Sequence, residues 1–361
     1  MTMEKITIME KLKNKVLLGL SGGVDSTAAV LMLKKKGFDV TGYYFDVSGN
    51  NAEGLAKAKL AASQLGIELM SESVKNEFEE TVTSNFCSEY SCGRTPNPCI
   101  ICNPLIKFKK LIEAADKIGA YYIATGHYAR VKEIDGKHYI QVGVNQKKDQ
   151  SYMLYRLPEG IISRLILPLG DIDDKEKIRE MARSENLSNA DDSDSQEICF
   201  IDDSFSGYEE FLRKRGFKSV EGNFVDKTGK VLGKHKGLCN YTIGQRKGLG
   251  IALGKPAFVT EINPKDNTVT LGENDDLFKK EVYSSGNVFT DSDLVLPEAG
   301  LKVKTKIRYA ARPAAAVIFD AGNGMVKAIF EEAQRAATPG QSIVFYIDDI
   351  VIGGGFIEWT K

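Results

Sequence analysis

The stretch Ser21-Gly22-Gly23-Val24-Asp25-Ser26 decides the fold of this chain, because it joins two segments of different periodicity. The apolar run Val16–Leu20 comes directly before it and predicts a buried strand, and the helical pattern Thr27–Lys36 follows it. Two consecutive glycines permit a tight turn whose backbone N–H groups can approach an anion, and Asp25 or Ser26 can cap the helix. We therefore expect an anion-binding strand–turn–helix unit, with an ordinary strand–helix turn as the alternative.

A phosphate at this turn is not expected to be held as in a Walker A loop, because the chain contains no G-x-x-x-x-G-K-[ST] segment. The six residues resemble instead the pyrophosphate loop of enzymes that activate a substrate by adenylation. That resemblance implies ATP, and Asp25 could help to hold Mg²⁺ beside the leaving pyrophosphate.

Composition limits the class of protein. A length of 361 residues predicts two or three domains, and 42% hydrophobic with 27% charged residues is typical of a globular protein. The net charge of −1 gives no global basic field, so any RNA contact must come from local patches. No apolar run approaches a membrane span, and six cysteines in so long a chain indicate reactive thiols, so a cytoplasmic location is expected.

Short apolar strands alternate with helical stretches in the first two hundred residues. This alternation predicts a doubly wound parallel α/β sheet with its ligand at the carboxyl ends of the strands, where Ser21–Ser26 and Thr125–His127 both lie. The expected strands are Val16–Leu20, Val40–Phe45 and Tyr121–Thr125, and the expected helices are Thr27–Lys36, Ala52–Leu65, Leu105–Ile118 and Lys175–Glu185.

Helical periodicity fades after Leu212, and short alternating segments with glycine-rich turns take over. We expect three domains: an α/β domain over 1–205, a small β-rich middle domain over 206–273 and a β-barrel-like domain over 274–361.

Cysteines stand out in Gly93–Asn103, which contains two prolines and a C-x-x-C pair. If Asn103 caps the helix that follows, Cys102 lies at a helix N-terminus, where the pKa of its thiol would fall below the usual value. The alternative is a structural zinc site made by Cys87, Cys92, Cys99 and Cys102. Cys199 is flanked by Ile198 and Phe200, as a buried structural cysteine would be.

Cations alternate with other residues in Leu301–Arg308. On a strand, Lys302, Lys304, Lys306 and Arg308 would face one side and repel one another, which favours a polyanion partner over a merely solvated face.

Ten segments in order resemble the bacterial tRNA-specific 2-thiouridylases (tRNA-uridine 2-sulfurtransferases) over nearly the whole chain: GLSGGVDS, GRTPNPCIICN, ATGHYAR, KDQSYML, LPLGD, DSQEICFI, YTIGQRKGLG, IRYAARP, TPGQSIVFY and GGGFI. The resemblance implies a catalytic domain of the adenine nucleotide α-hydrolase-like type and a tRNA-binding C-terminal barrel. It implies ATP and Mg²⁺, with tRNA carrying a wobble uridine (U34; lysine, glutamate or glutamine type) as substrate. Adenylation of the C2 oxygen would precede sulfur transfer from a persulfide, which a cysteine desulfurase or relay protein supplies.

The resemblance also implies roles for single residues. Cys199 would carry the persulfide, and Cys102 would free sulfide from it or form a disulfide with it as sulfur leaves. The implied nucleotide contacts are Gly19, Leu20, Ser21, Gly22, Gly23, Val24, Asp25, Ser26, Phe45 and Gly126. The implied tRNA contacts are Asn97, Pro98, Cys99, His127, Lys148, Asp149, Gln150, Arg308, Tyr309 and Gln341, although a purely structural His127 is equally compatible with the sequence.

Two departures from the resemblance stand out. Many relatives have Asp where this chain has Cys99, and a thiol cannot replace an acid–base carboxylate. Cys99, Cys102 and Cys199 could then bind a [4Fe–4S] cluster, as an alternative to simple persulfide chemistry. The stretch Lys255–Val259 lacks an aromatic pair common there. The competing hypotheses are another pyrophosphate-loop synthetase and a non-catalytic RNA- or metal-binding module.

Overall fold

A computed structural model describes residues 14–49, 51–192, 198–201 and 205–361. The chain forms two compact units, each assembled from separate segments. The first unit comprises Met1–Thr81, Cys99–Gln196 and Asp349–Ile352, and the second comprises Val82–Pro98, Glu197–Asp348 and Gly353–Lys361.

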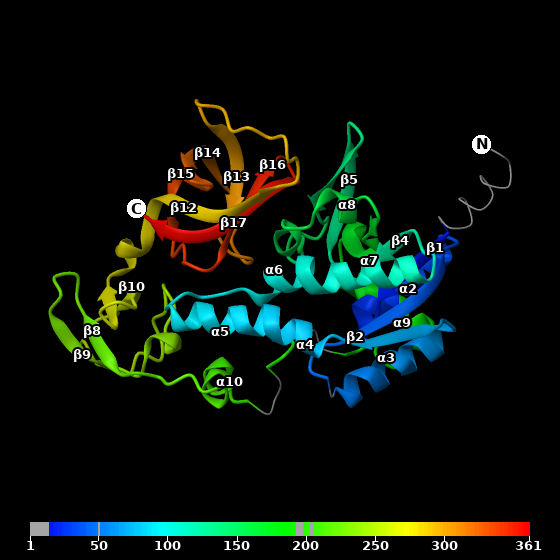
Figure 1. The fold of residues 1–361 in the computed structure, drawn as a ribbon, viewed down its shortest axis with the longest axis horizontal. Coiled ribbons are helices and arrows are strands. Elements are labelled where there is room, and N and C mark those ends of the chain that lie inside the picture. The colour runs from blue at the N-terminus through cyan, green and yellow to red at the C-terminus, as the bar shows by residue number, and fades with distance from the viewer. Residues whose placement is uncertain (1–13, 50, 193–197, 202–204) are drawn as a thin grey trace. The chain divides into compact units, whose positions relative to one another are not determined.

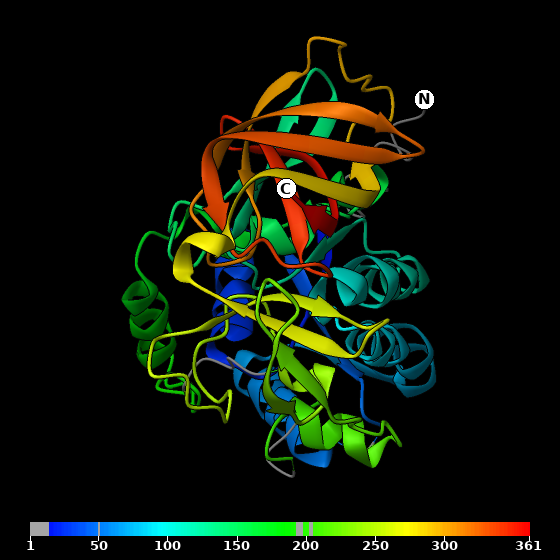
Figure 2. The ribbon, with the colours of Figure 1, turned by 90° about the vertical axis from the view of Figure 1, so that its left-hand side faces the viewer.

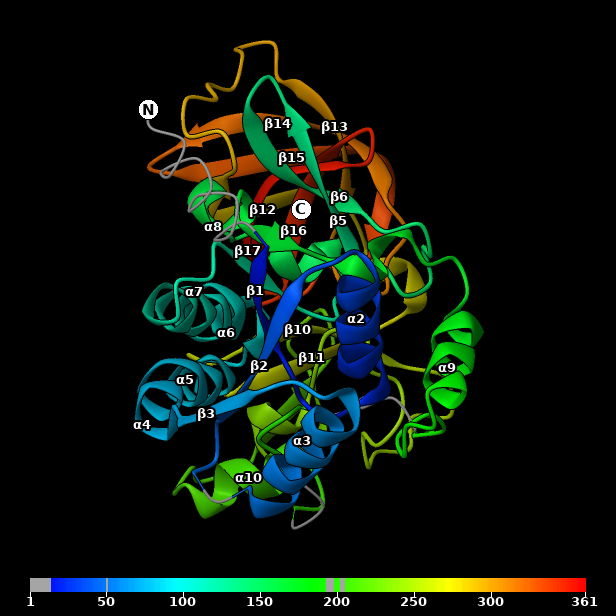
Figure 3. The same ribbon diagram turned by 90° about the vertical axis from the view of Figure 1, so that its right-hand side faces the viewer.

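A five-stranded sheet in the order β3-β2-β1-β4-β7 forms the centre of the first unit, and every neighbouring pair in it is parallel. Helices α2 and α3 cover one face and α7 covers the other (Figure 3). The predicted doubly wound parallel sheet is therefore confirmed. The strands are β1 (Lys15–Gly19), β2 (Asp39–Asp46), β3 (Leu69–Ser73), β4 (Tyr122–Ala124) and β7 (Leu165–Ile166). The helices are α2 (Val24–Lys35), α3 (Ala52–Leu65), α7 (Phe108–Lys117) and α9 (Lys175–Ser184).

The core of this unit follows from the side-chain alternation of β1. Val16 and Leu18 pack with the buried faces of α2, α3 and α9, while Leu17 between them is fully buried outside that cluster. A central strand that is buried on both faces fixes the position of the turn that follows it.

A hairpin of β5 (Ala129–Ile134) and β6 (Lys137–Val142) extends the first unit, and Gln141 pairs with Ile350 from near the end of the chain. Asp349 accepts hydrogen bonds from Arg130 (3.1 Å) and Gln141 (2.8 Å). The shorter elements are α4 (Lys75–Phe78), α6 (Pro98–Cys102), α8 (Glu159–Ile162), the π-helical turns Glu79–Thr83 and Asn103–Lys107, and the 3₁₀ turns Ser151–Leu154 and Pro168–Asp171.

The second unit contains two further structures in addition to helices α5 (Ser84–Ser91) and α10 (Tyr208–Lys214), which share an aromatic cluster. A four-stranded sheet has the order β10-β11-β8-β9. Its strands are β8 (Gly222–Val225), β9 (Val231–His235), β10 (Phe258–Asn263) and β11 (Thr268–Gly272), with 3₁₀ turns at Leu238–Asn240 and Asn274–Leu277.

Six antiparallel strands form a barrel in the order β12-β15-β14-β13-β16-β17, and pairing of β12 with β17 closes it. Its long curved strands are coloured from yellow to red in Figures 1 and 2. The predicted β-rich middle segment and C-terminal barrel are thus confirmed. The strands are β12 (Phe278–Phe289), β13 (Leu301–Lys306), β14 (Ala314–Gly322), β15 (Met325–Arg335), β16 (Ser342–Ile347) and β17 (Ile350–Thr360).

Within the described part of the chain, no helix has both the length and the apolar character needed to span a bilayer.

Candidate functional site

The glycine loop Ser21–Ser26 connects the carboxyl end of β1 to the start of α2 as the sequence predicts. Gly22 has a φ of +84°, and Gly23 is the N-cap of α2. The predicted side-chain cap is wrong: no side chain of the described residues caps this helix, because Asp25 lies inside its first turn and the Ser26 hydroxyl donates to the Gly23 carbonyl at 2.9 Å. The Gly23 N–H donates to the Ser21 hydroxyl at 3.3 Å, but the N–H groups of the first turn of α2 are not taken up by a capping side chain, as an anion site requires.

Two glycines let other segments approach the loop closely. A Cβ on Gly22 would lie 2.7 Å from the carbonyl carbon of Lys57 in α3. A Cβ on Gly126, in the turn after β4, would lie 3.1 Å from the Asp25 backbone. The two predicted nucleotide-contacting segments, Gly19–Ser26 and Gly126, therefore meet at the carboxyl edge of the sheet. Phe45, near the end of β2, is half-buried with its ring 5.9 Å from that of Tyr43.

Each carboxylate oxygen of Asp25 faces a donor group from another segment. The Tyr128 hydroxyl donates to Oδ1 at 2.7 Å, and the Lys175 ammonium lies 3.2 Å from Oδ2. Sequence reasoning missed both residues, since only the fold brings them to the loop. Tyr128 follows Thr125–His127, a segment already assigned to this edge, and that proximity could have indicated it.

Asn189 is a further residue that the sequence did not indicate. Its side-chain amide donates to the Gly22 carbonyl at 2.5 Å and to the Thr27 hydroxyl at 3.0 Å. The side chain is buried, and its Oδ1 has no hydrogen-bond partner among the residues that the structure describes. Asn189 thus fixes the orientation of the Gly22 peptide from a distant part of the chain.

The predicted position of Cys102 at a helix N-terminus is wrong. The helical run begins four residues earlier, at Pro98, and continues through the π-turn Asn103–Lys107 into α7. Proline is favoured in the first turn of a helix, and a π-turn accommodates the missing N–H of Pro104. Asn103 is therefore not a cap, and its side chain instead donates to the Met153 carbonyl at 2.8 Å.

Burial raises the pKa of the Cys102 thiol above its ordinary value, and the nearby Lys107 ammonium offsets only part of this rise. A thiol at a helix N-terminus would have its pKa lowered, so the predicted direction of the shift is wrong. The prediction depended on where the helix starts. Cys102 lies inside a buried helix, so the N–H groups at the helix end do not lower the pKa of its thiol.

The remaining cysteines differ in exposure. Cys99 and Cys199 are exposed, Cys87 is buried, and none of the six cysteines is in a disulfide. Cys199 belongs to the second unit, and Asp194–Glu197, which precede it, lie outside the described residues. The alternative that Cys199 is a buried structural cysteine is wrong, because Cys199 is exposed in a turn. Within the described ranges, no group of three or more His, Cys, Asp or Glu side chains is arranged to hold a metal ion.

His127 is half-buried, with its ring 5.8 Å from that of Phe108 and its Nδ1 2.7 Å from the Thr125 hydroxyl. Desolvation lowers the pKa of His127 well below its ordinary value, and the Lys107 charge acts in the same direction. The imidazole is therefore neutral at pH 7. It can form hydrogen bonds, but it cannot supply a cation to a phosphate.

The loop Lys148-Asp149-Gln150 has an internal role that the sequence does not reveal. Asp149 is buried, and its carboxylate accepts from the backbone N–H groups of Gly143 and Ser151 at 3.0 and 3.1 Å. The side-chain carbonyl of Gln150 accepts from the Tyr128 N–H at 2.9 Å. Asp149 thus ties the loop to the residue that follows β6, and Gln150 ties it to the residue that precedes β5.

In the second unit, the segment before Asn97 packs against the turn that contains Gln341. The Gln341 amide donates to the Thr95 carbonyl at 2.8 Å, and the Thr95 N–H donates to the Pro339 carbonyl at 2.9 Å. The structure therefore brings Gln341 next to the segment that contains Asn97 and Pro98. Asn97 is half-buried and Pro98 is buried.

The predicted row of four exposed cations is only partly correct. Lys302 and Lys304 are exposed on β13, and Arg308 is exposed beyond the end of that strand. Lys306 is 7% exposed, with its ammonium 5.7 Å from the centre of the Tyr309 ring. Tertiary packing covers the end of the row, so two strand lysines and Arg308 remain accessible.

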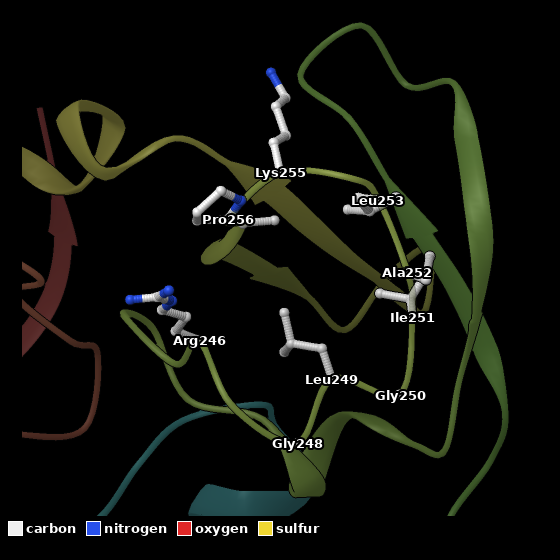
Figure 4. A pocket seen from close by; sticks show the side chains of 10 residues that line it. Arg246, Gly248, Leu249, Gly250, Ile251, Ala252, Leu253, Lys255 and Pro256 are labelled. Carbon is white, nitrogen blue, oxygen red and sulfur yellow. The ribbon is translucent and has the colours of Figure 1, made fainter.

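A cavity of about 460 Å³ lies in the middle segment of the second unit (Figure 4). Leu249, Ile251 and Leu253 supply apolar walls, and Arg246 lies at its side. Lys255, Pro256 and Ala257 also line the cavity, so the stretch without the aromatic pair borders open space.

Three family descriptions match successive parts of the chain. Residues 14–203 match "tRNA methyl transferase HUP domain", residues 209–273 match "tRNA methyl transferase PRC-barrel domain", and residues 289–357 match "Aminomethyltransferase beta-barrel domain". A HUP domain is consistent with nucleotide binding at the glycine loop.

Curated relatives match at full length. Proteins named tRNA-specific 2-thiouridylase MnmA from Clostridioides difficile (43% identical) and Clostridium beijerinckii (44%) each align with 96% of this chain and 99% of their own length. The similarity to a solved NMN synthetase from Francisella tularensis, with 15% identity and a TM-score of 0.34 over 54% of this chain and 76% of that chain, is too low to support any argument. The relatives cover both units and carry the name that the ten segments led us to expect, so the chain belongs to the tRNA-specific 2-thiouridylase family.

Proposed function

We propose that this chain catalyses the ATP- and Mg²⁺-dependent 2-thiolation of the wobble uridine U34 of tRNA. The observation that carries the proposal is the glycine loop at the carboxyl end of β1, which leads into α2 without a side-chain cap. A phosphate group suits such a helix start, and Asp25 beside it is a suitable ligand for Mg²⁺. The names of the full-length relatives support tRNA as the substrate.

The proposed nucleotide site at this edge of the sheet depends on two glycines, Gly22 and Gly126, that neighbouring segments approach closely. Any side chain at Gly22 or Gly126 would displace the backbone of a neighbouring segment. We expect Gly19–Ser26 to contact the phosphates and Gly126 to contact the nucleoside, with Phe45 beside the adenine.

The proposed chemistry has two steps. The uridine C2 oxygen attacks the α-phosphorus of ATP while the proton on N3 is lost, and the α–β phosphoanhydride bond breaks to release pyrophosphate. The terminal sulfur of a Cys199 persulfide then attacks C2, and the C2–O bond breaks to release AMP.

Transfer is completed when the Cys102 thiolate attacks the γ-sulfur of Cys199. The bond between that sulfur and the transferred sulfur breaks, the 2-thiouridine is released, and a Cys102–Cys199 disulfide forms. A thiol reductant must then restore the two cysteines, and a persulfide donor must reload Cys199. Because burial raises the pKa of Cys102, its proton must be removed as the step occurs.

We propose that tRNA is contacted by Asn97, Pro98, Cys99, His127, Lys148, Arg308, Tyr309 and Gln341, with Asp149 and Gln150 shaping their loop from within. Domain boundaries at 205/206 and 273/274 belong to the same proposal. Cys99 and Cys102 fit a three-cysteine cluster poorly, since one is exposed and the other buried, and no step here is routed through iron.

The test uses the full chain, tRNA, ATP and a persulfide donor, with separate measurement of pyrophosphate release, AMP release and 2-thiouridine. Cys199→Ser is expected to abolish thiolation while tRNA-dependent activation of ATP remains. Cys239→Ser is the matched control, since this cysteine lies in the same unit and has no proposed role.

The outcomes separate the alternatives. ATP cleavage that ignores tRNA would favour another pyrophosphate-loop synthetase, and tRNA binding without ATP cleavage would favour a non-catalytic module. Thiolation by inorganic sulfide only after anaerobic reconstitution with iron, lost in Cys99→Ala, would favour the cluster-dependent variant.

A further inference from the structure

Lys175 is the residue near the glycine loop for which neither the motif nor the proposed mechanism has a role. Its ammonium lies 3.2 Å from Asp25 Oδ2, and its side chain is 13% exposed. The Tyr128 hydroxyl occupies Oδ1 of the same carboxylate at 2.7 Å. The carboxylate proposed as a Mg²⁺ ligand is thus already neutralised by a protein cation.

The fold holds Lys175 firmly in this place. It is the first residue of α9, whose preceding residue Asp174 caps the helix by accepting from the Glu176 N–H at 3.0 Å. Ile178 and Ala182 of α9 are fully buried in the same core cluster as α2. The start of α9 is therefore anchored beside the start of α2, where the phosphates of a nucleotide would lie.

Other charges bound at the loop can replace the two members of the Lys175–Asp25 ion pair. A divalent cation can take Oδ2 only if the ammonium leaves it, whereas the Tyr128 bond to Oδ1 can stay. An ammonium that leaves a carboxylate in a largely buried position is stabilised by an anion bound nearby, because buried charges are costly without compensation. Pyrophosphate at the loop carries several negative charges within reach of a flexible lysine side chain.

We propose that Lys175 is a pyrophosphate-binding residue of the adenylation step, and that Asp25 holds its ammonium in position until the nucleotide and metal arrive. This inference rests on the proposed function. When the uridine oxygen attacks the α-phosphorus and the α–β bond breaks, the bonding electron pair passes to the pyrophosphate oxygen. The Lys175 ammonium stabilises the charge that develops there without giving up its proton.

The experiment measures binding of two probes to the full chain by calorimetry: inorganic pyrophosphate with Mg²⁺, and AMP. Lys175→Met is expected to weaken pyrophosphate binding by about 10- to 100-fold, which is the usual loss for one charge-assisted hydrogen bond. AMP binding should stay within about twofold, and Lys175→Arg should recover most of the pyrophosphate affinity.

Lys177→Met is the matched control, because Lys177 lies two residues further along α9, is well exposed and pairs with Asp173 at 2.6 Å. It should leave both affinities unchanged. Equal weakening of both probes by Lys175→Met, or no weakening of either, would show that Lys175 is only structural and overturn the inference. If Lys175→Met does not fold, Lys175→Gln, which retains a donor for Asp25, gives the same comparison.

Failure of the proposed function remains distinguishable from failure of this inference. If the wild-type chain releases no AMP with tRNA, ATP and a persulfide donor, the proposed function is wrong, whatever Lys175 does. If it releases AMP and Lys175→Met binds pyrophosphate normally, only the inference is wrong.

Discussion

The glycine loop after β1 and the cysteines Cys99 and Cys102 of helix α6 belong to the same unit, but different forces set their geometry. In the loop, hydrogen bonds among Ser21, Gly23 and Ser26 define the turn locally. In the helix, the chemical state of Cys102 depends on where the helix starts and on what covers the thiol. The geometry of the turn can be predicted from its six residues, whereas the burial of the Cys102 thiol cannot be predicted from the residues around it in the sequence.

The largest expected effect comes from breaking the loop. Gly22→Ala would place a Cβ 2.7 Å from the Lys57 backbone at a φ of +84°, so we expect loss of at least about 100-fold in AMP release. The measurement is tRNA-dependent AMP formation, with thermal unfolding recorded in parallel.

Gly37→Ala is the matched control for that variant. Gly37 has nearly the same φ, +85°, but its Cβ would meet nothing within 4 Å. It should cost only about 1 kcal/mol of stability and leave activity intact. Equal activity in the two variants would mean that the close approach to α3 is not needed.

The second prediction concerns the cysteine side of the comparison. Because burial raises the pKa of Cys102, the rate of its alkylation by iodoacetamide should keep rising from pH 7 to pH 9 without levelling off. Mass spectrometry of peptides would follow each cysteine separately. Exposed Cys99, one helical turn away, should react at least about tenfold faster at pH 7.

A rate for Cys102 that levels off below pH 8 would contradict this prediction. It would show that the thiol is activated in solution despite its burial, as the sequence alone suggested.

Much of the fold could be predicted from the sequence, because β1, α2, α3 and α9 each have a strong local pattern. The loop was placed correctly for the same reason. The start of the cysteine helix was misplaced because Asn103 imitates a cap, while the residues that bury Cys102 come from distant segments. Tyr128, Lys175 and Asn189 were missed because only tertiary structure brings them to the loop.

The smallest expected effect concerns the barrel, where it again tests a local sequence pattern against the burial that tertiary packing imposes. Lys302→Ala with Lys304→Ala removes two exposed cations from β13, leaving buried Lys306 in place. If both meet phosphates, tRNA affinity should fall several-fold, and the slope of log affinity against log salt should decrease by about 1.5 to 2 units. Fluorescence anisotropy with labelled tRNA at several salt concentrations measures both quantities.

Lys280→Ala provides the barrel control, since exposed Lys280 lies on β12, three strands from β13 in either direction around the closed barrel. An unchanged slope in the double variant would identify the lysines as solvated surface. Loss of stability in the double variant would instead show that exposure alone misjudges these positions.

The segment Asp349–Ile352 has a consequence for how the protein is made. It completes the first unit through Asp349, which binds Arg130 and Gln141, and through Ile350, which pairs with β6. During synthesis from the N-terminus, the hairpin β5–β6 can therefore form these contacts only with residues made more than two hundred positions later. Contacts of such sequence separation form slowly and late. The nucleotide loop can thus fold early on the ribosome, while the unit that contains it is finished only after Asp349–Ile352 have emerged.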